Sequence, residues 1–360
     1  MPSTIKNLVI GGGGTAGYCY IGALRELFGS DDSDDKPKLS DVKNFIGTSA
    51  GSIMATILSC TSNQEYLMEK FAQFDVSKLQ DDSYGMMMDL YRLYYKFGYN
   101  KGEYALNVMR EIMGELTGNP KITFAEHYEK TKHNLVITGS NTTTKQIVYF
   151  NRLTHPNMEV ALAVRASMSI PLMFVPITYQ TEKFQNILGT KAIYVDGGLL
   201  DNYPFHLVLS DLFELLDGDA DVTDEQIEAA LFELYSVRDD ESDDTEHSDA
   251  DEDRREKIIA ETIGIKSYNT DSLSAIDPMT NQLINHSQSS VKDFTLGIVG
   301  MLMDYTLKLH INSDIWERTV KIDIGTISTT NFDIDQEDIE NMLDIGKKCG
   351  IAFNASLTDN

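Results

Sequence analysis

A serine flanked by glycines is the first feature of the sequence that suggests chemistry. Ser49 lies in GTSAG, so that Gly47 and Gly51 are its second neighbours on either side. The apolar segment NFI precedes this motif and SIMATIL follows it. A strand, a sharp turn and a helix are the setting in which the serine of a G-x-S-x-G motif becomes an exposed nucleophile. We therefore expect Ser49 to be a nucleophile; the alternative is a glycine-rich corner whose serine has no catalytic role.

A nucleophilic serine needs a base, and histidine is the first residue type to consider. In an α/β-hydrolase the histidine follows the serine and the acid along the chain. None of the late histidines lies in a glycine-marked turn, because one falls in an acidic stretch and two fall in helical patterns. These late histidines are His206, His247, His286 and His310.

An aspartate is the better candidate for the base. Asp196 ends the apolar run KAIYV and is followed by Gly197 and Gly198. This order places its carboxylate at the end of a strand, where glycines let the backbone approach closely. Asp201 is a competing acid, but it lies beyond the strand end. The structural alternative for Asp196 is a common Asp-Gly turn.

The glycine run GGGGTAG, residues 11–17, stands between a strand-like and a helix-like segment. It fits the dinucleotide fingerprint G-x-G-x-x-G, which also requires a second strand ending in an acidic residue about 20 residues later. That region is SDDSDDKPKLS, which is typical of a loop. The other use of such glycines is to present backbone N–H groups to a developing oxyanion. We expect Gly12, Gly13 and Gly14 to line an oxyanion hole, with Gly17 closing the motif.

Strand-like and helix-like segments alternate along the rest of the chain. This alternation predicts an α/β fold with a mainly parallel sheet covered on both faces. We expect a single domain over residues 1–360, since no Pro- or Gly-rich linker divides it. The expected strands are 6–10, 43–47, 133–140, 145–151, 191–198, 261–265 and 318–324, and the expected helices include 18–28, 52–60, 158–168, 291–309 and 337–348.

The charge of the chain is strongly acidic, with a formal net charge of -26. This excludes binding to a nucleic-acid backbone, which needs clustered Lys and Arg, and it opposes charge-driven adhesion to anionic membranes. Residues 238–256, RDDESDDTEHSDADEDRRE, carry much of the charge. We expect this acidic insertion to be a solvated, disordered loop.

The cysteines and the apolar runs bear on the compartment and on metal binding. Cys19, Cys60 and Cys349 are far apart, which fits a reducing compartment and no zinc site. The N-terminus lacks the apolar stretch of a signal peptide. The run FTLGIVGMLM, residues 294–303, is shorter than the roughly 20 residues needed to span a bilayer. We expect a cytoplasmic protein, or one peripheral on membranes, with no transmembrane segment and no metal.

Three motifs in this order, GGGTAG, GTSAG and DGG, resemble the patatin-like phospholipase family. The resemblance extends over nearly the whole chain outside the acidic insertion, for example in FGYNKGEYALNVMREIMGE and VRASMSIPLMFVPI. It implies a three-layer α/β/α sandwich and a lipid acyl hydrolase of phospholipase A type that needs neither calcium nor another cofactor. It further implies an acyl-enzyme on Ser49, Asp196 as the base, and an oxyanion hole at residues 12–14.

One residue departs from the family pattern. Ala16 stands where family members commonly have Arg or Lys just before the last glycine of the first motif. The missing charge is not part of the Ser–Asp dyad, so we expect activity to survive. What the departure puts in question is substrate orientation and the stability of the glycine loop.

Several alternatives remain open at this point. The chain could be a catalytically silent, patatin-like lipid-binding or regulatory protein, although all three motifs are intact. The sequence does not decide between phospholipid and neutral glyceride, or whether an activating protein partner is needed. The segment YGMMMDLYRLYYKFGYN, residues 84–100, is either a helix packed on the core or a flexible cap over the acyl pocket that contacts lipid.

Overall fold

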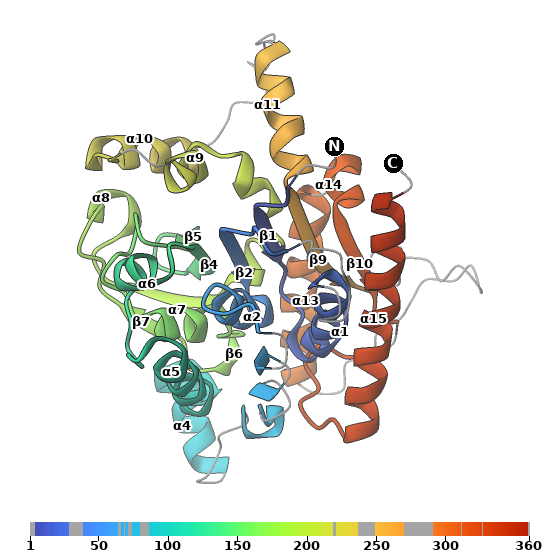
Figure 1. Cartoon of the computed structure of the whole chain (residues 1–360). Coiled ribbons are helices and arrows are strands. Elements are labelled where there is room, and N and C mark those ends of the chain that lie inside the picture. Colours follow the sequence, from blue (N-terminus) through green and yellow to red (C-terminus); the bar gives the residue numbers. More distant parts are fainter. Residues whose placement is uncertain are drawn as a thin grey trace.

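The structure is a computed structural model of the chain (Figure 1). It describes residues 4–28, 39–63, 66–67, 69–70, 74–79, 86–218, 221–236, 249–269, 291–310, 312–325 and 327–358.

A central sheet organises the described chain. Its parallel part has the order β10-β9-β1-β2-β4, and the antiparallel strands β8 and β7 continue it beyond β4, while β5 pairs with β4 in antiparallel fashion. The strands are β1 (Asn7–Ile10), β2 (Asn44–Thr48), β4 (Asn134–Asn141), β5 (Gln146–Phe150), β7 (Ile177–Tyr179), β8 (Ala192–Asp196), β9 (Thr262–Tyr268) and β10 (Thr319–Asp323). Every residue of β1, β2 and β4 is buried, as expected for strands covered on both faces.

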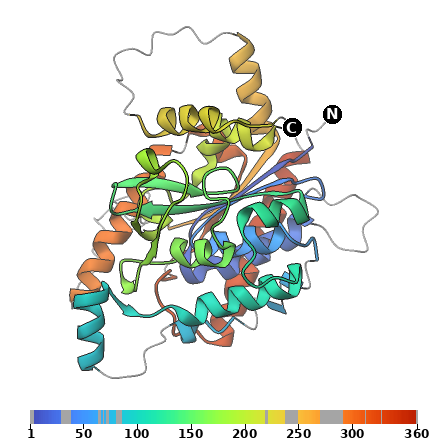
Figure 2. The same ribbon diagram turned by 90° about the vertical axis from the view of Figure 1, so that its left-hand side faces the viewer.

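The sheet separates two apolar cores. Along β1, Leu8 and Ile10 pack into one core and Val9 into the other, because successive strand residues point to opposite faces. Figure 2 shows helices above and below the sheet. The first core contains residues of α1 (Gly17–Phe28), α2 (Ala50–Leu58), α5 (Glu103–Thr117), α6 (Phe124–Thr131), α7 (Val160–Ser167) and α15 (Gln336–Thr358). The second contains residues of α8 (Gln185–Leu188), η4 (Pro204–Leu209), α9 (Asp211–Asp217), α10 (Asp224–Tyr235), α11 (Asp249–Ala260) and α14 (Ser313–Glu317). The predicted three-layer α/β/α sandwich is confirmed.

Smaller elements complete the architecture around the glycine loop and the strand ends. They are η1 (Gly14–Ala16), η2 (Val76–Leu79), η3 (Gly197–Leu199), α13 (Val291–His310) and the two-stranded sheet of β3 (Gly98–Asn100) and β6 (Leu172–Phe174). The pairs β4–β8 and β8–β7 are antiparallel, which the alternation of strands and helices did not indicate.

Two expectations need correction. Part of the acidic insertion is helical, since residues 249–256 belong to α11 (Asp249–Ala260); residues 238–248 lie outside the described chain. The segment at 84–100 contains α4 (Met86–Lys96), and four of its aromatic residues are exposed rather than packed on the core. They are Tyr91, Tyr94, Tyr95 and Phe97. The side chains of residues 86–90 lie outside the description.

Candidate active site

Ser49 occupies a one-residue turn between β2, which ends at Thr48, and α2, which begins at Ala50. Its φ of 51° and ψ of -124° are a conformation that non-glycine residues rarely adopt. The backbone is held there from outside, because the Ser49 N–H donates a hydrogen bond to Ser167 Oγ on α7 at 2.8 Å. The predicted strand-turn-helix setting of the serine is therefore present.

The two glycines of the serine motif are required by close backbone packing. A Cβ at position 47 would overlap the backbone of Gly51 and Ser52. One at position 51 would overlap the carbonyl of Ile10 on β1. A Cβ on Gly17, at the start of α1, would lie 3.2 Å from the Met54 methyl group and 3.5 Å from the Ala50 Cβ on α2. Together these glycines let the turn of Ser49 sit directly against the first strand and helix.

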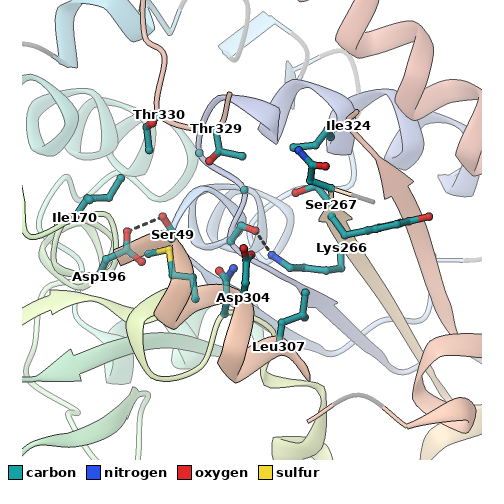
Figure 3. Close-up of a pocket in the computed structure, with 18 residues that line it drawn as sticks. Ser49, Ile170, Asp196, Lys266, Ser267, Asp304, Leu307, Ile324, Thr329 and Thr330 are labelled. Carbon is teal, nitrogen blue, oxygen red and sulfur yellow. Dashed lines mark hydrogen bonds between the residues drawn. The ribbon is translucent and has the colours of Figure 1, made fainter. Parts of the chain in front are cut away.

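Asp196 is the last residue of β8 and lies opposite the serine (Figure 3). Ser49 Oγ donates a hydrogen bond to Asp196 Oδ2 at 2.8 Å, and the Gly198 N–H donates to Oδ1 at 2.8 Å. Asp196 is fully buried, and burial raises its pKa to about 7 although these two hydrogen bonds and the charge of Lys266 oppose the rise. A carboxylate with such a pKa is suited to take up a proton near neutral pH.

The glycines that follow Asp196 also have a steric reason. A Cβ on Gly197 would overlap the Thr138 carbonyl on β4, and one on Gly198 would crowd Asn202 and the carboxylate of Asp196 itself. The DGG motif therefore brings the backbone of η3 against the carboxylate, where the Gly198 N–H can bind it.

The glycine loop contains two N–H groups that donate no hydrogen bond within the described chain. The amides on either side are engaged: Gly12 N–H donates to the Asn202 carbonyl at 2.9 Å, and Thr15 N–H donates to the Thr329 carbonyl at 3.1 Å. For the N–H groups of Gly13 and Gly14, no acceptor occurs among the described residues. All three glycines, 12 to 14, line the same cavity as Ser49. Gly12 contributes space rather than a donor, since a Cβ there would meet Asn202 and the Ser49 side chain.

A buried lysine behind this loop was not predicted. Lys266 on β9 is 2% exposed and donates a hydrogen bond through Nζ to the Gly12 carbonyl. Burial lowers its pKa to about 8, against the charges of Asp304, Asp196 and Asp201. The signal in the sequence is a single lysine within the apolar strand TIGIKSY. Ala16 carries no charge and is fully buried, whereas the Lys266 ammonium on β9 reaches the carbonyl of Gly12 in the glycine loop.

The competing acid and the late histidines have other surroundings. Asp201 Oδ2 accepts a hydrogen bond from the Tyr149 hydroxyl at 2.8 Å, and Oδ1 accepts one from the Tyr203 N–H at 3.2 Å. His206 Nε2 lies 3.7 Å from Asp201 Oδ2, outside the cavity at Ser49. His247, His286 and the side chain of His310 lie outside the described structure. Among the described residues that line the cavity there is no histidine.

Two pockets meet at Ser49. A cavity of about 250 Å³, called the polar cavity below, is lined by polar side chains such as Asn202, Lys266, Ser267 and Asp304 and by apolar ones such as Met303 and Leu307 (Figure 3). A narrower pocket of about 40 Å³ is mainly apolar. Gly14, Ser49 and Ile170 border both. The apolar pocket is lined by residues of α1, α2, η2 and the loops near β6 and α15, which include Tyr18, Ile53, Phe74, Val76, Leu79, Met168, Phe174 and Phe332.

Within the described residues, no group of three or more His, Cys, Asp or Glu side chains could hold a metal ion. Among the helices described, none is long and apolar enough to cross a membrane.

Comparison with known proteins agrees with this geometry. The family model for patatin-like phospholipase matches residues 8–209, which is more than half of the chain. The chain belongs to the patatin-like phospholipase family. It is 28% identical over 213 residues to a probable lipid hydrolase, 463L, of Invertebrate iridescent virus 6, and 30% identical over 224 residues to triacylglycerol lipase 4 of Saccharomyces cerevisiae.

The similarity to these relatives is partial. The matched region covers 58% of this chain in both cases, 64% of the viral protein and 23% of the yeast protein. A protein of Acanthamoeba polyphaga mimivirus, R571, is 30% identical over 210 residues, which are 63% of its length. The crystal structure of VipD from Legionella pneumophila has a similar fold, with a TM-score of 0.50 and 16% identity over 98% of this chain and 67% of VipD.

Proposed function

We propose that this protein is a serine lipid acyl hydrolase of phospholipase A type that works through a Ser49–Asp196 dyad without calcium. The observation that supports this most directly is the 2.8 Å hydrogen bond from Ser49 Oγ to the buried Asp196 carboxylate. It lies beside two N–H groups, those of Gly13 and Gly14, that have no acceptor in the described chain. A nucleophile, a base and oxyanion donors are what acyl transfer requires.

The proposed reaction has two halves. Asp196 takes the proton of Ser49 as Oγ attacks the ester carbonyl, and the Gly13 and Gly14 N–H groups stabilise the oxyanion of the tetrahedral intermediate. The proton passes from Asp196 to the leaving alcohol, which leaves a fatty acyl group on Ser49. Asp196 then takes a proton from water as the water oxygen attacks the acyl carbonyl, and returns that proton to Ser49 Oγ as the fatty acid leaves. Each charge is met by a residue of the chain, so no step is assigned to calcium.

The two pockets suggest how a lipid is placed. The apolar pocket between α1, α2 and η2 suits the acyl chain, because its lining is aliphatic and aromatic. The larger polar cavity then receives the glycerol and what it carries. Both phospholipids and neutral glycerides fit this division; the family is named for phospholipase activity and one relative for triacylglycerol lipase activity.

The test is release of fatty acid from mixed phospholipid and triglyceride vesicles with calcium chelated. Wild-type protein should release fatty acid, while folded Ser49→Ala and Asp196→Asn should not. Asp201→Asn is the matched control, because Asp201 is a buried aspartate five residues away that does not line the cavity. Full activity in Ser49→Ala would refute the proposal.

A catalytically silent lipid-binding or regulatory protein of the same fold is the alternative. It is separated by labelling with a fluorophosphonate, which reacts with an activated serine. Labelling of wild type but not of Ser49→Ala, together with no fatty acid release, would indicate an enzyme that needs an activating protein partner. No labelling of either would favour the silent protein.

A further inference from the structure

The helix α13 (Val291–His310) has two faces with different surroundings. Gly300, Met303, Asp304 and Leu307 follow one another at helical spacing and line the polar cavity at Ser49 (Figure 3). Met303 also contacts the DGG turn, since its methyl group would lie 3.1 Å from a Cβ on Gly198. This face of α13 is therefore a wall of the substrate cavity.

The opposite face of α13 is apolar and exposed. Its residues also recur at helical spacing, and three of them are more than half exposed: Phe294 at 55%, Met301 at 63% and Tyr305 at 61%. Ile298 and Leu302 lie on the same side and are 39% and 41% exposed. Figure 2 shows α13 (orange) along the left-hand edge of the molecule, with α4 (teal) below it. A contiguous apolar face of this kind on a surface helix marks an interaction site.

From these two faces we propose that α13 docks on an uncharged or zwitterionic lipid surface through Phe294, Ile298, Met301, Leu302 and Tyr305. This deepens the proposed function and rests on it. The occupant follows from continuity with the cavity: the same helix that walls the site of ester cleavage turns large apolar side chains outward. The five residues carry no charge, and the net charge of -26 repels an anionic membrane. A surface of phosphatidylcholine or neutral glyceride is the partner that matches both facts.

The orientation has a chemical consequence. With the outer face of α13 in the lipid interface, a lipid reaches Ser49 by passing around one helix, without crossing bulk water. Apolar residues that enter the interface contribute binding in proportion to the area they bury. Docking through α13 therefore raises the local substrate concentration at the dyad while leaving the chemistry at Ser49 unchanged.

The experiment measures binding and turnover separately. In a Ser49→Ala background, binding to phosphatidylcholine vesicles is measured by flotation for the parent and for Met301→Glu/Tyr305→Glu. We expect the double substitution to weaken binding about tenfold or more, since two large side chains no longer enter the interface. Phe232→Glu on α10, where the phenylalanine is 70% exposed, is the matched control and should bind like the parent.

Turnover is then measured in the active background with p-nitrophenyl butyrate in solution and with the vesicles. The double variant should keep its rate on the soluble ester and lose rate on vesicles. Unchanged vesicle binding, or an equal loss in Phe232→Glu, would overturn the docking proposal. So would sedimentation showing that the wild type is a dimer which the double variant dissociates while vesicle binding persists. Absence of turnover on either substrate would count against the proposed function alone, because flotation needs no catalysis.

A different observation concerns the carbonyl of Gly12. It accepts hydrogen bonds from the Tyr20 hydroxyl at 3.0 Å and from Lys266 Nζ. In a planar trans peptide the C=O and the N–H of the next residue point in opposite directions. The carbonyl is drawn toward α1 and β9, so the N–H of the same peptide, that of Gly13, is directed away from them and toward the cavity.

From this arrangement we propose that Lys266 is a positioning residue that fixes the Gly12–Gly13 peptide with its N–H toward the oxyanion. Tyr20 supports the same carbonyl from α1, and its hydroxyl is 2.7 Å from Ser267 Oγ on β9. Lys266 touches no reacting atom itself. A lysine in this place is costly to bury, and its charge is met by Asp304 on α13, by Asp196 on β8 and by Asp201 beyond it.

The variant Lys266→Met tests this role. Losing the orientation of one oxyanion donor is expected to lower kcat about 10- to 100-fold on the soluble ester, with KM unchanged. Above its pKa of about 8 the lysine loses its charge and holds the carbonyl less firmly, so wild-type kcat should fall on the alkaline side. That alkaline fall should be absent in Lys266→Met.

Two further variants serve as a control and as a second test. Lys321→Met is the control, since Lys321 is the register partner of Lys266 on β10 but is exposed. Tyr20→Phe removes the second donor to the same carbonyl and should lower kcat less, again at constant KM, which decides the matter if Lys266→Met fails to fold. A kcat within twofold of wild type in both variants would overturn the proposal. A rise in KM at constant kcat would do so too, because it would make Lys266 a substrate-binding residue.

Discussion

Ser49 and Asp196 are 147 residues apart in the sequence, and the hydroxyl of one donates a hydrogen bond to the carboxylate of the other at 2.8 Å. Ser49 stands at the end of β2 and Asp196 at the end of β8, on either side of β4. Because β8 runs antiparallel to β4 and pairs only with its last residues, Gly139 to Asn141, the end of β8 reaches back to the serine turn. The antiparallel addition to the sheet is thus what closes the dyad.

The first prediction concerns the dyad itself. Ser49→Ala and Asp196→Asn should each lower kcat about 10³-fold or more on a soluble ester, because one removes the nucleophile and the other its base. Asp201→Asn should keep kcat per folded molecule. It should lower the free energy of unfolding by about 1–3 kcal/mol, since the buried Tyr149 hydroxyl loses a charged acceptor. Steady-state kinetics and urea denaturation check the two effects.

The second prediction concerns the pH dependence of activity. Burial raises the pKa of Asp196 to about 7, so kcat should fall as the pH drops below about 7 and the base becomes protonated. The acidic limb should follow one ionisation. An acidic limb near pH 4, the range of an exposed carboxyl, would contradict the assignment of Asp196 as the base.

The raised pKa of Asp196 also predicts that its ionised carboxylate lowers the stability of the folded protein. The folded-state pKa is above the value of 3.8 for a free aspartate, so the folded protein binds this proton more tightly than the unfolded chain does. Its contribution to stability is full below about pH 4 and is lost as the pH rises through about 7. Asp196→Asn should therefore melt at a higher temperature than wild type at pH 8, with a smaller difference at pH 5. Thermal denaturation at the two pH values measures this.

A fourth prediction concerns the glycine at the serine turn. Gly51→Ala should lower the free energy of unfolding by about 2–4 kcal/mol, because the new Cβ would overlap the carbonyl of Ile10 on β1. Gly118→Ala is the comparison. Gly118 has a positive φ of 75° but open space around it, so that variant should cost only about 1 kcal/mol. A loss in Gly51→Ala no larger than that in Gly118→Ala would show that the structure relaxes around the new Cβ, and would contradict the requirement for close packing at Gly51.

The acyl pocket gives the fifth prediction. Ile53→Trp on α2 should fill part of the narrow apolar pocket. The ratio of kcat/KM for a C16 ester to that for a C4 ester should fall about tenfold or more, because a long chain loses its apolar contacts while a short one does not reach them. The C4 ester serves as the internal control for folding and for the dyad. An unchanged ratio would place the acyl chain elsewhere.

Much of the fold could be predicted from the sequence because its signals are local. Runs such as NLVI and NFIGT are apolar throughout, which identifies strands buried on both faces, and the glycines of GTSAG identify the turn between β2 and α2. The same locality explains the errors. Residues 249–256 are charged all around and lack an apolar stripe, so nothing in their pattern indicated the helix that α11 forms.

The sequence predicted the site residues that lie in motifs, but not those that depend on tertiary contacts. Asp196 and the glycine loop lie in recognisable sequence motifs. Lys266, in contrast, is a single lysine in an apolar strand, and its hydrogen-bond partner, the Gly12 carbonyl, is 254 residues away in the sequence. The engagement of the Gly12 N–H by the Asn202 carbonyl is likewise a tertiary contact. It leaves the N–H groups of Gly13 and Gly14 without an acceptor among the described residues, and both glycines line the cavity. The exposed apolar face of α13 could not be predicted from the sequence, because it depends on which face of the helix lines the cavity.

The walls of the cavity come from two stretches of chain. The dyad, the glycine loop and most of the apolar pocket fall within residues 8–209, the part that matches the family model. Met303 and Asp304 on α13, and Thr329 and Thr330 beyond β10, form the opposite wall and follow that part. Substitutions or insertions after residue 209 can thus reshape what the cavity admits while the proposed Ser49–Asp196 dyad stays fixed. In such a protein, substrate choice can change between relatives independently of the residues of the proposed dyad.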